Sequence, residues 1–384
     1  MDTFISDLAE TYVTKLQKKG EGNLQFVEFK MDANQENNIG MHSDGVSGKI
    51  IYKINDDLCE SEMVFVKFVS TEDPAHTYRP SVVAMFETEI HFYTQVVPFL
   101  NSLRSIQHLI PTFLHNKKRT QQGDTIAILF RHVGPQWVGN NFKSFLDYAH
   151  LSLMVRKIGE FHAYSFAAKS KDESQFQKLL SFRNDSVTTA IELFEVHMKR
   201  TLERCLQPLR QNRQYVEAVP RLEKLVQNFK EYVCQSFTCS PEDQYYVLGH
   251  RSFNQSNVLF SYVDHRPVDM KIMDWQSAEF VSLGIDLICL LYADASQQTR
   301  NECWDQLLDD YYGSLKTTFD DNVVPSKDQI PKEMKKAVGA AILLVTYRAN
   351  KSHLKTDSQD ASETLWTDEW VTEILKDMVD RSLL

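Results

Sequence analysis

The sequence predicts an α+β protein of two parts, a small β-rich part with one main helix followed by a larger, mostly helical part. Two observations define the first part: runs of β-branched and aromatic residues within 50–69, and an apolar run at 125–130. A third defines the second part, because helical spacing of apolar residues dominates from residue 142 onward. We place the boundary so that residues 1–132 form the first part and 133–384 the second. A chain of 384 residues can bury a sizeable core in each.

The elements of the first part follow from local patterns. Residues 50–54 and 63–69 are predicted strands separated by a polar loop. Residues 82–100 carry apolar side chains at mixed three- and four-residue spacing, which predicts a helix of about five turns. Residues 125–130 are predicted to form a buried strand, and residues 1–20 resemble an amphipathic helix.

The second part is predicted to be mainly helical. Helical patterns cover residues 145–164, 188–205, 221–237 and the chain from 283 onward. Between them, a short strand at 245–248 and a hairpin of residues 258–262 and 268–273 are predicted.

The composition is that of a globular protein without a general affinity for nucleic acids or membranes. Apolar residues make up 42% of the chain and charged residues 24%, and the net charge of −10 gives no electrostatic reason to bind polyanions or anionic lipids. The chain shows no secretory signal and no apolar run of about 18 residues. Its six cysteines are scattered without a CxxC pair, which is typical of thiols in a reducing compartment. We therefore expect a cytoplasmic protein with neither a nucleic-acid nor a membrane partner.

The most specific motif runs from His250 to Asn257 and is followed by Asp274. Its spacing is that of a phosphotransferase catalytic loop, H-x-D-x-x-x-x-N, with a metal-binding aspartate on the next strand. Ser252 stands where the catalytic aspartate is expected. A serine cannot accept a proton near neutral pH as a carboxylate does, and loss of a general base typically costs roughly 10² to 10⁴ in rate. Arg251, beside it, either binds a phosphate or acidic group or braces the loop.

A lysine within a strand is the second candidate. Lys67 lies inside the apolar run at 63–69, where a lysine is costly unless it is paired or liganded. Glu89 or Glu87 on the following predicted helix is its expected partner. The alternative is an edge-strand lysine in water with two solvated glutamates.

Two further sets of residues suit phosphate and metal. Asn257 and Asp274 supply the oxygen ligands that Mg²⁺ prefers, although an aspartate at a strand end also commonly caps a turn. Gly45-Val46-Ser47-Gly48 precedes a predicted strand, so its amides and Ser47 form a candidate phosphate loop. Two glycines are equally compatible with a plain turn.

These motifs resemble the ecdysteroid kinase-like (CHK kinase-like) family of insects, which is related to choline kinases and aminoglycoside phosphotransferases. The family wording L-x-H-G-D-x-W-x-x-N-x-x-F, then D-F-Q, is similar to the run from Leu248 to Phe260 and to Asp274-Trp275-Gln276. Further similar segments are Phe86 to Tyr93 with Pro98, Val66-Lys67-Phe68, Ile158 to Ala163, and Asp286-Leu287. The resemblance covers about residues 35–320 and implies a bilobal protein-kinase-like fold with an N-lobe and a helical C-lobe.

The resemblance also implies cofactors and roles. ATP and Mg²⁺ are the implied cofactors, with Lys67 on the phosphates, Glu89 paired to it, and Asn257 and Asp274 on the metal. Asp286 is implied to brace the catalytic loop from a helix start.

The chain departs from the family wording at two places. Arg251 and Ser252 replace the loop's Gly-Asp, and Arg131, His132 and Val133 replace the Glu-Asp-Leu of the adenine-binding hinge, where backbone groups of Arg131 and Val133 remain candidates. We therefore favour a pseudokinase, or catalytically impaired member, that binds ATP–Mg²⁺ and a small apolar alcohol. The alternative is an active ATP-dependent phosphotransferase acting on a hydroxyl of a small molecule such as an ecdysteroid.

The ligand or acceptor is expected to contact the helices of 142–240. Their aromatic side chains suit a flat, steroid-like molecule, although aromatic residues at helical spacing equally form plain core. These residues are Phe142, Phe145, Tyr148, Phe161, Tyr164 and Phe166.

Overall fold

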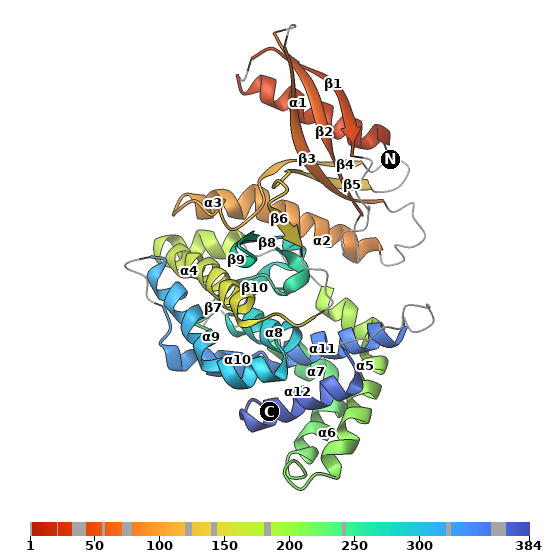
Figure 1. Ribbon diagram of the computed structural model, residues 1–384, viewed down its shortest axis with the longest axis vertical. Coiled ribbons are helices and arrows are strands. Elements are labelled where there is room, and N and C mark those ends of the chain that lie inside the picture. The colour runs from red at the N-terminus through yellow and green to blue at the C-terminus, as the bar shows by residue number, and fades with distance from the viewer. Residues whose placement is uncertain are drawn as a thin grey trace. The chain divides into compact units, whose positions relative to one another are not determined.

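The structure of the protein is a computed structural model (Figure 1) that describes residues 2–20, 22–32, 44–55, 58–70, 79–119, 125–139, 144–179, 186–239, 243–319, 324–354 and 366–384. The chain divides into two compact units: Met1–Val138 with Lys271–Gln276, and Gly139–Met270 with Ser277–Leu384. Strands form the core of the first unit and helices dominate the second, so the predicted α+β fold class is confirmed. The division differs from the boundary drawn on the sequence in two respects: the first unit extends to Val138 instead of residue 132, and it also includes Lys271–Gln276.

The first unit is built on an antiparallel sheet of order β1-β2-β3-β5-β4. Its strands are β1 (Leu24–Met31), β2 (Asp44–Ile54), β3 (Leu58–Ser70), β4 (Phe113–Arg119) and β5 (Thr125–Arg131). In the central strand β3, Lys67 lies opposite Gly45 of β2 and Ile128 of β5. Because side chains alternate between the two faces of a sheet, Lys67 lies on one face and Val66 on the other.

A helix covers each face of this sheet. Helix α1 (Asp2–Lys18) packs on the Val66 face, and apolar side chains of α1 and of the sheet form one buried cluster there. The Lys67 face receives a helical run of α2 (Arg79–His91), the π-helical turn η1 (Phe92–Val96) and α3 (Val97–Asn101). The helix predicted at 82–100 is therefore present, but a π-helical turn interrupts its α-helical geometry.

The phosphate loop predicted at Gly45-Val46-Ser47-Gly48 is wrong as a loop before the strand, and so is the alternative of a plain turn. These residues lie inside β2 and pair with β3, and Ser47 lies opposite Phe65. Gly48 has a packing reason, because a Cβ at this position would lie 2.5 Å from the ring of Phe29 on β1. The glycine allows β1 and β2 to approach closely, and residues 33–43 before the strand lie outside the described part of the chain.

The second unit contains most of the helices. They are α4 (Tyr148–Leu179), α5 (Ser186–Arg210), α6 (Val219–Gln227), α7 (Phe229–Ser236), α8 (Gly284–Asp294), α9 (Gln297–Thr317), α10 (Ile330–Lys336), α11 (Val338–Leu354) and α12 (Asp368–Asp380), with the 3₁₀ turns η2 (Gln255–Asn257) and η4 (Lys327–Gln329). Strands β7 (Tyr246–Gly249) and β10 (Glu279–Ser282) pair antiparallel, and β8 (Val258–Val263) and β9 (Arg266–Ile272) are the predicted hairpin. The chain passes between the units within β6 (Trp137–Gly139), at the end of β9, and within the 3₁₀ turn η3 (Trp275–Ser277).

Helix α8 is the buried element around which the second unit is organised. Every residue from Gly284 to Asp294 is buried, and α8 contacts α10 and α11. Two carboxylates, those of Asp286 and Asp294, are therefore inside the protein at the two ends of this helix.

Helix α4 packs on α9 at a glycine. A Cβ at Gly159 would lie 2.7 Å from the carbonyl oxygen of Tyr311, so only glycine permits this approach. The aromatic residues Phe161, Tyr164 and Phe166 of α4 are buried and belong to the core of the second unit. Their burial favours the alternative that these aromatic residues form plain core.

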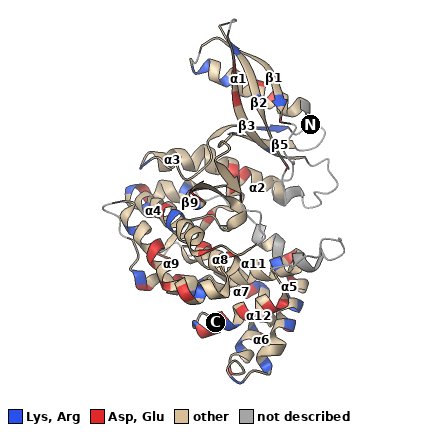
Figure 2. Cartoon of the chain, in the orientation of Figure 1, with Lys and Arg blue, Asp and Glu red and all other residues tan. Residues whose placement is uncertain are grey.

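Charged residues of both signs are interspersed along the helices of the second unit, as Figure 2 shows for α5, α9 and α12. Among the described residues, no helix combines the length and the apolar character that a membrane span requires.

Candidate functional site

Lys67 is the centre of a buried charged cluster in the first unit. Its Nζ lies 2.5 Å from Glu89 Oε2 and also contacts Asp274 Oδ1. The side chains of Lys67 and Glu89 are only 9% and 1% exposed. Of the two glutamates that the sequence left open, Glu89 is thus the partner, whereas Glu87 is half exposed and contacts Lys118.

The cluster holds its charges against a strong desolvation cost. Burial alone lowers the pKa of Lys67, but the Asp274 and Glu89 carboxylates outweigh it and hold that pKa above its ordinary value. Burial raises the pKa of Glu89, and the charge of Lys67 opposes this rise. Lys67 therefore stays cationic, as a phosphate-binding group requires.

Asp274 is held in an uncommon backbone conformation. Its φ of 63° lies in the left-handed region, which costs a non-glycine residue roughly 1–2 kcal/mol. Its neighbours fix the segment within the first unit: the Ile272 N–H donates to the Leu109 carbonyl at 2.7 Å, and the Trp275 ring stacks on Phe92 with centroids 4.2 Å apart. Such residues concentrate at functional sites, where the surrounding structure enforces the strained conformation.

Asp286 holds the first residues of the loop at 250–257 in the second unit. Its Oδ2 accepts from the His250 N–H at 2.7 Å and its Oδ1 from the Arg251 N–H at 2.8 Å. The carboxylate lies in the first turn of α8, where the helix dipole favours a negative charge. Gly249 makes room for it, because a Cβ there would lie 3.2 Å from Asp286 Oδ2 and would collide with Val281.

A second layer of side chains supports Asp286. His162 of α4 places Nε2 3.2 Å from Asp286 Oδ2 and Nδ1 2.9 Å from the Tyr311 hydroxyl of α9. Burial alone raises the pKa of Asp286, but hydrogen bonding and charge from His162 and His250 outweigh it and lower that pKa. The sequence pointed to the segment that contains His162, but it gave no signal for Tyr311, which lies 149 positions further along the chain.

Ser252 is tied into the loop by amide groups. The Asn257 Nδ2 donates to the Ser252 carbonyl at 2.8 Å and to its Oγ at 3.1 Å, and the Asn254 Nδ2 donates to the same carbonyl at 2.8 Å. The Ser252 N–H faces His250 Nδ1 at 3.3 Å. The hydroxyl is therefore held in place, but it supplies no carboxylate for proton transfer. Because the Asn257 nitrogen faces Ser252, its amide oxygen is the atom suited to a metal.

Arg251 braces the loop. Its Nη1 forms an ion pair with Glu279 Oε2, and its guanidinium lies 4.9 Å from the ring centre of Phe237. Its backbone is left-handed with φ of 63°, at the position where the family wording has glycine. Burial lowers the pKa of Arg251, opposed by the charge of Glu279. Because Glu279 already pairs with the charge of Arg251, the structure favours the interpretation that Arg251 braces the loop over the interpretation that it binds an anion.

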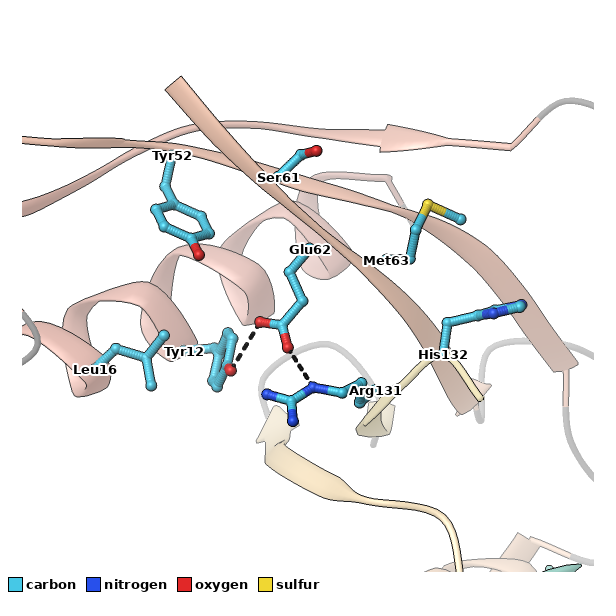
Figure 3. A pocket seen from close by; sticks show the side chains of 8 residues that line it. All are labelled: Tyr12, Leu16, Tyr52, Ser61, Glu62, Met63, Arg131 and His132. Carbon is cyan, nitrogen blue, oxygen red and sulfur yellow. Dashed lines mark hydrogen bonds and ion pairs between the residues drawn. The ribbon is translucent and has the colours of Figure 1, made fainter. Parts of the chain in front are cut away.

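The side chain of Arg131 lies on the α1 face of the sheet, opposite to Lys67. Figure 3 shows it with Glu62, whose Oε1 accepts from Arg131 Nε at 2.7 Å and whose Oε2 accepts from the Tyr12 hydroxyl at 3.0 Å. A pocket of about 540 Å³ is lined here by Tyr12, Leu16, Tyr52, Ser61, Glu62, Met63, Arg131 and His132. The register pairs Arg131 with Val64 on the α1 face, so its side chain points away from Lys67, and the contact of its backbone with the nucleotide stays a prediction.

The other two predicted cofactor residues lie in different settings. Ser47 is buried on the Lys67 face, since it pairs with Phe65 two positions before Lys67. Val133 follows β5, and its carbonyl accepts from Gln136 Nε2 at 3.3 Å.

The oxygen set of the first unit suits Mg²⁺ bound together with phosphates. Among the described residues, no group of three His, Cys, Asp or Glu side chains forms an all-protein metal site. Mg²⁺ commonly uses only one or two carboxylates plus substrate phosphates, and Asp274 beside the cationic Lys67 fits that pattern.

Comparison with known proteins identifies the family. Among curated proteins, none matches the chain. Solved structures similar to it include an ethanolamine kinase of Plasmodium vivax (9% identity, 94% of this chain and 83% of that one, TM-score 0.45) and wild-type aminoglycoside 2′-phosphotransferase-IIIa with GDP (13%, 96% and 98%, 0.41). Another is an amicoumacin kinase with AMP-PNP and Ca²⁺ (10%, 96% and 93%, 0.42). The sequence matches the ecdysteroid kinase-like family over residues 29–322, which is most of its length, and the chain therefore belongs to that family.

Proposed function

We propose that the protein binds ATP–Mg²⁺ together with a small apolar alcohol, and that it is impaired in phosphoryl transfer. The observation that carries the nucleotide part is the Lys67–Glu89–Asp274 cluster, in which Lys67 and Glu89 are buried and Asp274 is partly exposed. A buried lysine held between two carboxylates is expensive as a purely structural device, because ion pairs inside proteins are often no more stable than apolar packing. A site for phosphates and a metal ion requires a cation and a carboxylate, and this cluster supplies both.

Each residue of the cluster has a distinct role in this proposal. Lys67 supplies the cation for the phosphates, and Glu89 orients its ammonium group from α2. Asp274 supplies the carboxylate for Mg²⁺, which neutralises phosphate charge when bound. By the resemblance of its loop to the family wording, Asn257 is proposed as a further metal ligand through its amide oxygen.

The impairment follows from the loop. Ser252 occupies the position of the base, and the nearest amide groups donate to it, so nothing at this position takes a proton from an acceptor hydroxyl. Positioning and charge neutralisation remain, and they support binding and residual turnover.

Calorimetric titration with ATP, with and without Mg²⁺, tests the nucleotide part. We expect Mg²⁺-dependent binding to the wild-type protein and a loss of about tenfold or more in Asp274→Ala. Asp269→Ala is the matched control, because Asp269 is a carboxylate of β9, the strand that ends shortly before Asp274, and it pairs with Lys157 instead. Equal affinities with and without Mg²⁺ in the wild-type protein would count against the proposal.

A kinase assay on ecdysteroids and other small alcohols tests the impairment. Ser252→Asp should raise the rate by roughly 10² to 10⁴, the contribution of a general base. The new carboxylate would meet the amide donors that now face Ser252, so the loop is suited to accept it.

The second candidate is an active phosphotransferase, favoured by the presence of Lys67, Glu89 and Asp274 in one cluster. It predicts wild-type turnover of about 1–100 s⁻¹ that Ser252→Asp does not accelerate. Lys67→Ala and Asp274→Ala should then abolish turnover, and unchanged rates in both would rule this candidate out.

A further inference from the structure

The far end of the loop at 250–257 is held by a second buried carboxylate, that of Asp294. It is the last residue of α8 and is fully buried. Its Oδ2 accepts from the Gln255 N–H at 2.7 Å, and its Oδ1 accepts from the Gln255 Nε2 at 3.0 Å. One carboxylate therefore binds both the backbone and the side chain of the residue that begins η2.

Arg348 of α11 neutralises this carboxylate. Its Nη1 donates to Asp294 Oδ1 at 2.8 Å and to the Ala293 carbonyl at 2.7 Å, and its guanidinium lies 5.2 Å from the ring centre of Trp366. The arginine is needed because the C-terminal end of a helix disfavours a negative charge, and burial disfavours it further.

The pair is a poor device for stability alone. Taking two charges out of water often costs more than their attraction returns, and well-packed apolar residues of similar volume do at least as well. Unlike an apolar residue, Asp294 provides a directed acceptor for the Gln255 N–H.

The loop is consequently held at two points by the two ends of one rigid helix. Asp286 binds the backbone of His250 and Arg251, and Asp294 binds Gln255. The two carboxylates are eight residues apart on α8, which corresponds to about 12 Å of helix. Asn257 belongs to the η2 turn that Gln255 begins, so the hold on Gln255 determines where its amide lies.

We propose that Asp294 and Arg348 form a positioning pair that fixes the η2 turn and, with it, the metal-binding amide of Asn257. Neither residue touches substrate in this proposal. It deepens the proposed function and rests on it for the role of Asn257, whereas the hold on the turn itself stands on the contacts alone.

Hydrogen–deuterium exchange on the full chain tests the hold without any ligand. In Asp294→Asn the acceptor is neutral and Arg348 loses its partner charge, so the amide of Gln255 and the η2 turn should exchange about tenfold faster. Asp377→Asn is the matched control: Asp377 is likewise a buried carboxylate that pairs with arginine, but its partners are Arg300 and Arg381, which lie outside the loop. Unchanged exchange of the turn in Asp294→Asn, or equal acceleration in the control, would overturn the proposal.

The ratio of ATP affinities with and without Mg²⁺ tests the consequence for Asn257. Asp294→Asn should reduce the gain from Mg²⁺ by about 10- to 100-fold, as loss of a group that orients a metal ligand does, and leave metal-free binding unchanged. Arg348→Lys keeps a positive charge and should restore part of the gain relative to Arg348→Ala. A general loss of stability would weaken both affinities alike, which counts against positioning.

The two failures are distinguishable. If the wild-type protein shows no Mg²⁺-dependent binding, the proposed function fails, and the exchange experiment alone decides whether Asp294 and Arg348 hold the turn. If wild-type binding depends on Mg²⁺ but Asp294→Asn leaves the ratio unchanged, the positioning pair is refuted and the proposed function stands.

Discussion

Removing the charge of Lys67 should make the free energy of unfolding depend on pH through Glu89. Lys67→Met keeps most of the side-chain length but leaves Glu89, which is 1% exposed, without its cation. Breaking a buried ion pair by removing one partner costs about 3–5 kcal/mol when the remaining group stays charged. Glu89 can avoid part of this cost by taking up a proton.

The sign of the pH dependence follows from the pKa of Glu89. Burial already raises this pKa and Lys67 opposes the rise, so the substitution raises it further. A carboxyl whose pKa is higher in the folded than in the unfolded protein binds more protons when folded. The free energy of unfolding therefore falls as pH rises from the unfolded-state pKa of about 4.3 through the folded-state value, by up to about 1.4 kcal/mol per pH unit.

The wild-type lysine behaves differently. The folded-state pKa of Lys67 is raised above its ordinary value. The contribution of Lys67 to stability is therefore complete below the unfolded-state pKa of about 10.4. It is lost only as the pH rises through the higher folded-state pKa. The additional slope of Lys67→Met relative to the wild-type protein, above the unfolded-state pKa of a glutamate and below about pH 8, is therefore assigned to Glu89.

Urea denaturation at about pH 4, 5, 6, 7 and 8 measures this slope. Lys67→Met should be destabilised most at the highest pH, and Lys67→Met with Glu89→Gln should lose the pH dependence. Lys118→Met is the matched control, because its ion pair with Glu87 is half exposed and is worth about 0–1 kcal/mol. A flat profile in Lys67→Met, or a slope that survives Glu89→Gln, would refute the reasoning.

Three further predictions concern the loop and its supports, and denaturation measures each. Gly249→Ala should destabilise the protein by about 1–3 kcal/mol because the new methyl group collides with a valine of β10, whereas Gly313→Ala, with nothing within 4 Å, should stabilise it by about 0.5–1 kcal/mol. Arg251→Ala should be about 1 kcal/mol less stable than Arg251→Gly. Both variants lose the Glu279 ion pair, but only alanine places a Cβ on a backbone in the left-handed region, where a Cβ is strained. Equal stabilities of the two variants would contradict the strain argument. Asp286→Asn should cost about 3 kcal/mol, because an amide offers one oxygen to two backbone N–H donors, and a loss below about 1 kcal/mol would show that the loop does not depend on this carboxylate.

Local patterns in the sequence located the elements and much of the candidate site. The alternation of β3 placed Lys67 on a single face, and Glu89 and Glu87 on the next helix were its two possible partners. The structure identifies Glu89, at 2.5 Å. The spacing from His250 to Asn257 indicated a compact loop, and Asn257 does donate to Ser252 within it. These features depend on short stretches of chain and on one helix packed against one strand.

The features that the sequence did not reveal depend on pairing and on distant contacts. Arg131 was expected to contact the nucleotide only through its backbone, and the sequence did not indicate that the register of β5 against β3 turns its side chain to the α1 face. Gly48 looked like a turn residue, and only the presence of β1 against β2 explains it as a packing glycine. Asp294 and Arg348 lie 54 positions apart, and no local pattern indicates that such a pair forms.

The buried groups that hold the loop at 250–257 indicate what the loop does. Two buried carboxylates hold the loop, and one of them requires a buried histidine and the other a partly buried arginine. Each such group carries a desolvation cost that apolar packing would avoid. A loop that had only to connect β7 to β8 would need neither carboxylate. The fixed geometry is instead useful to a function that depends on where Asn257 lies, and metal-assisted nucleotide binding depends on position far more than on a base at 252. The absence of a carboxylate at Ser252 is one more reason for our proposal that the protein binds a nucleotide better than it transfers phosphate.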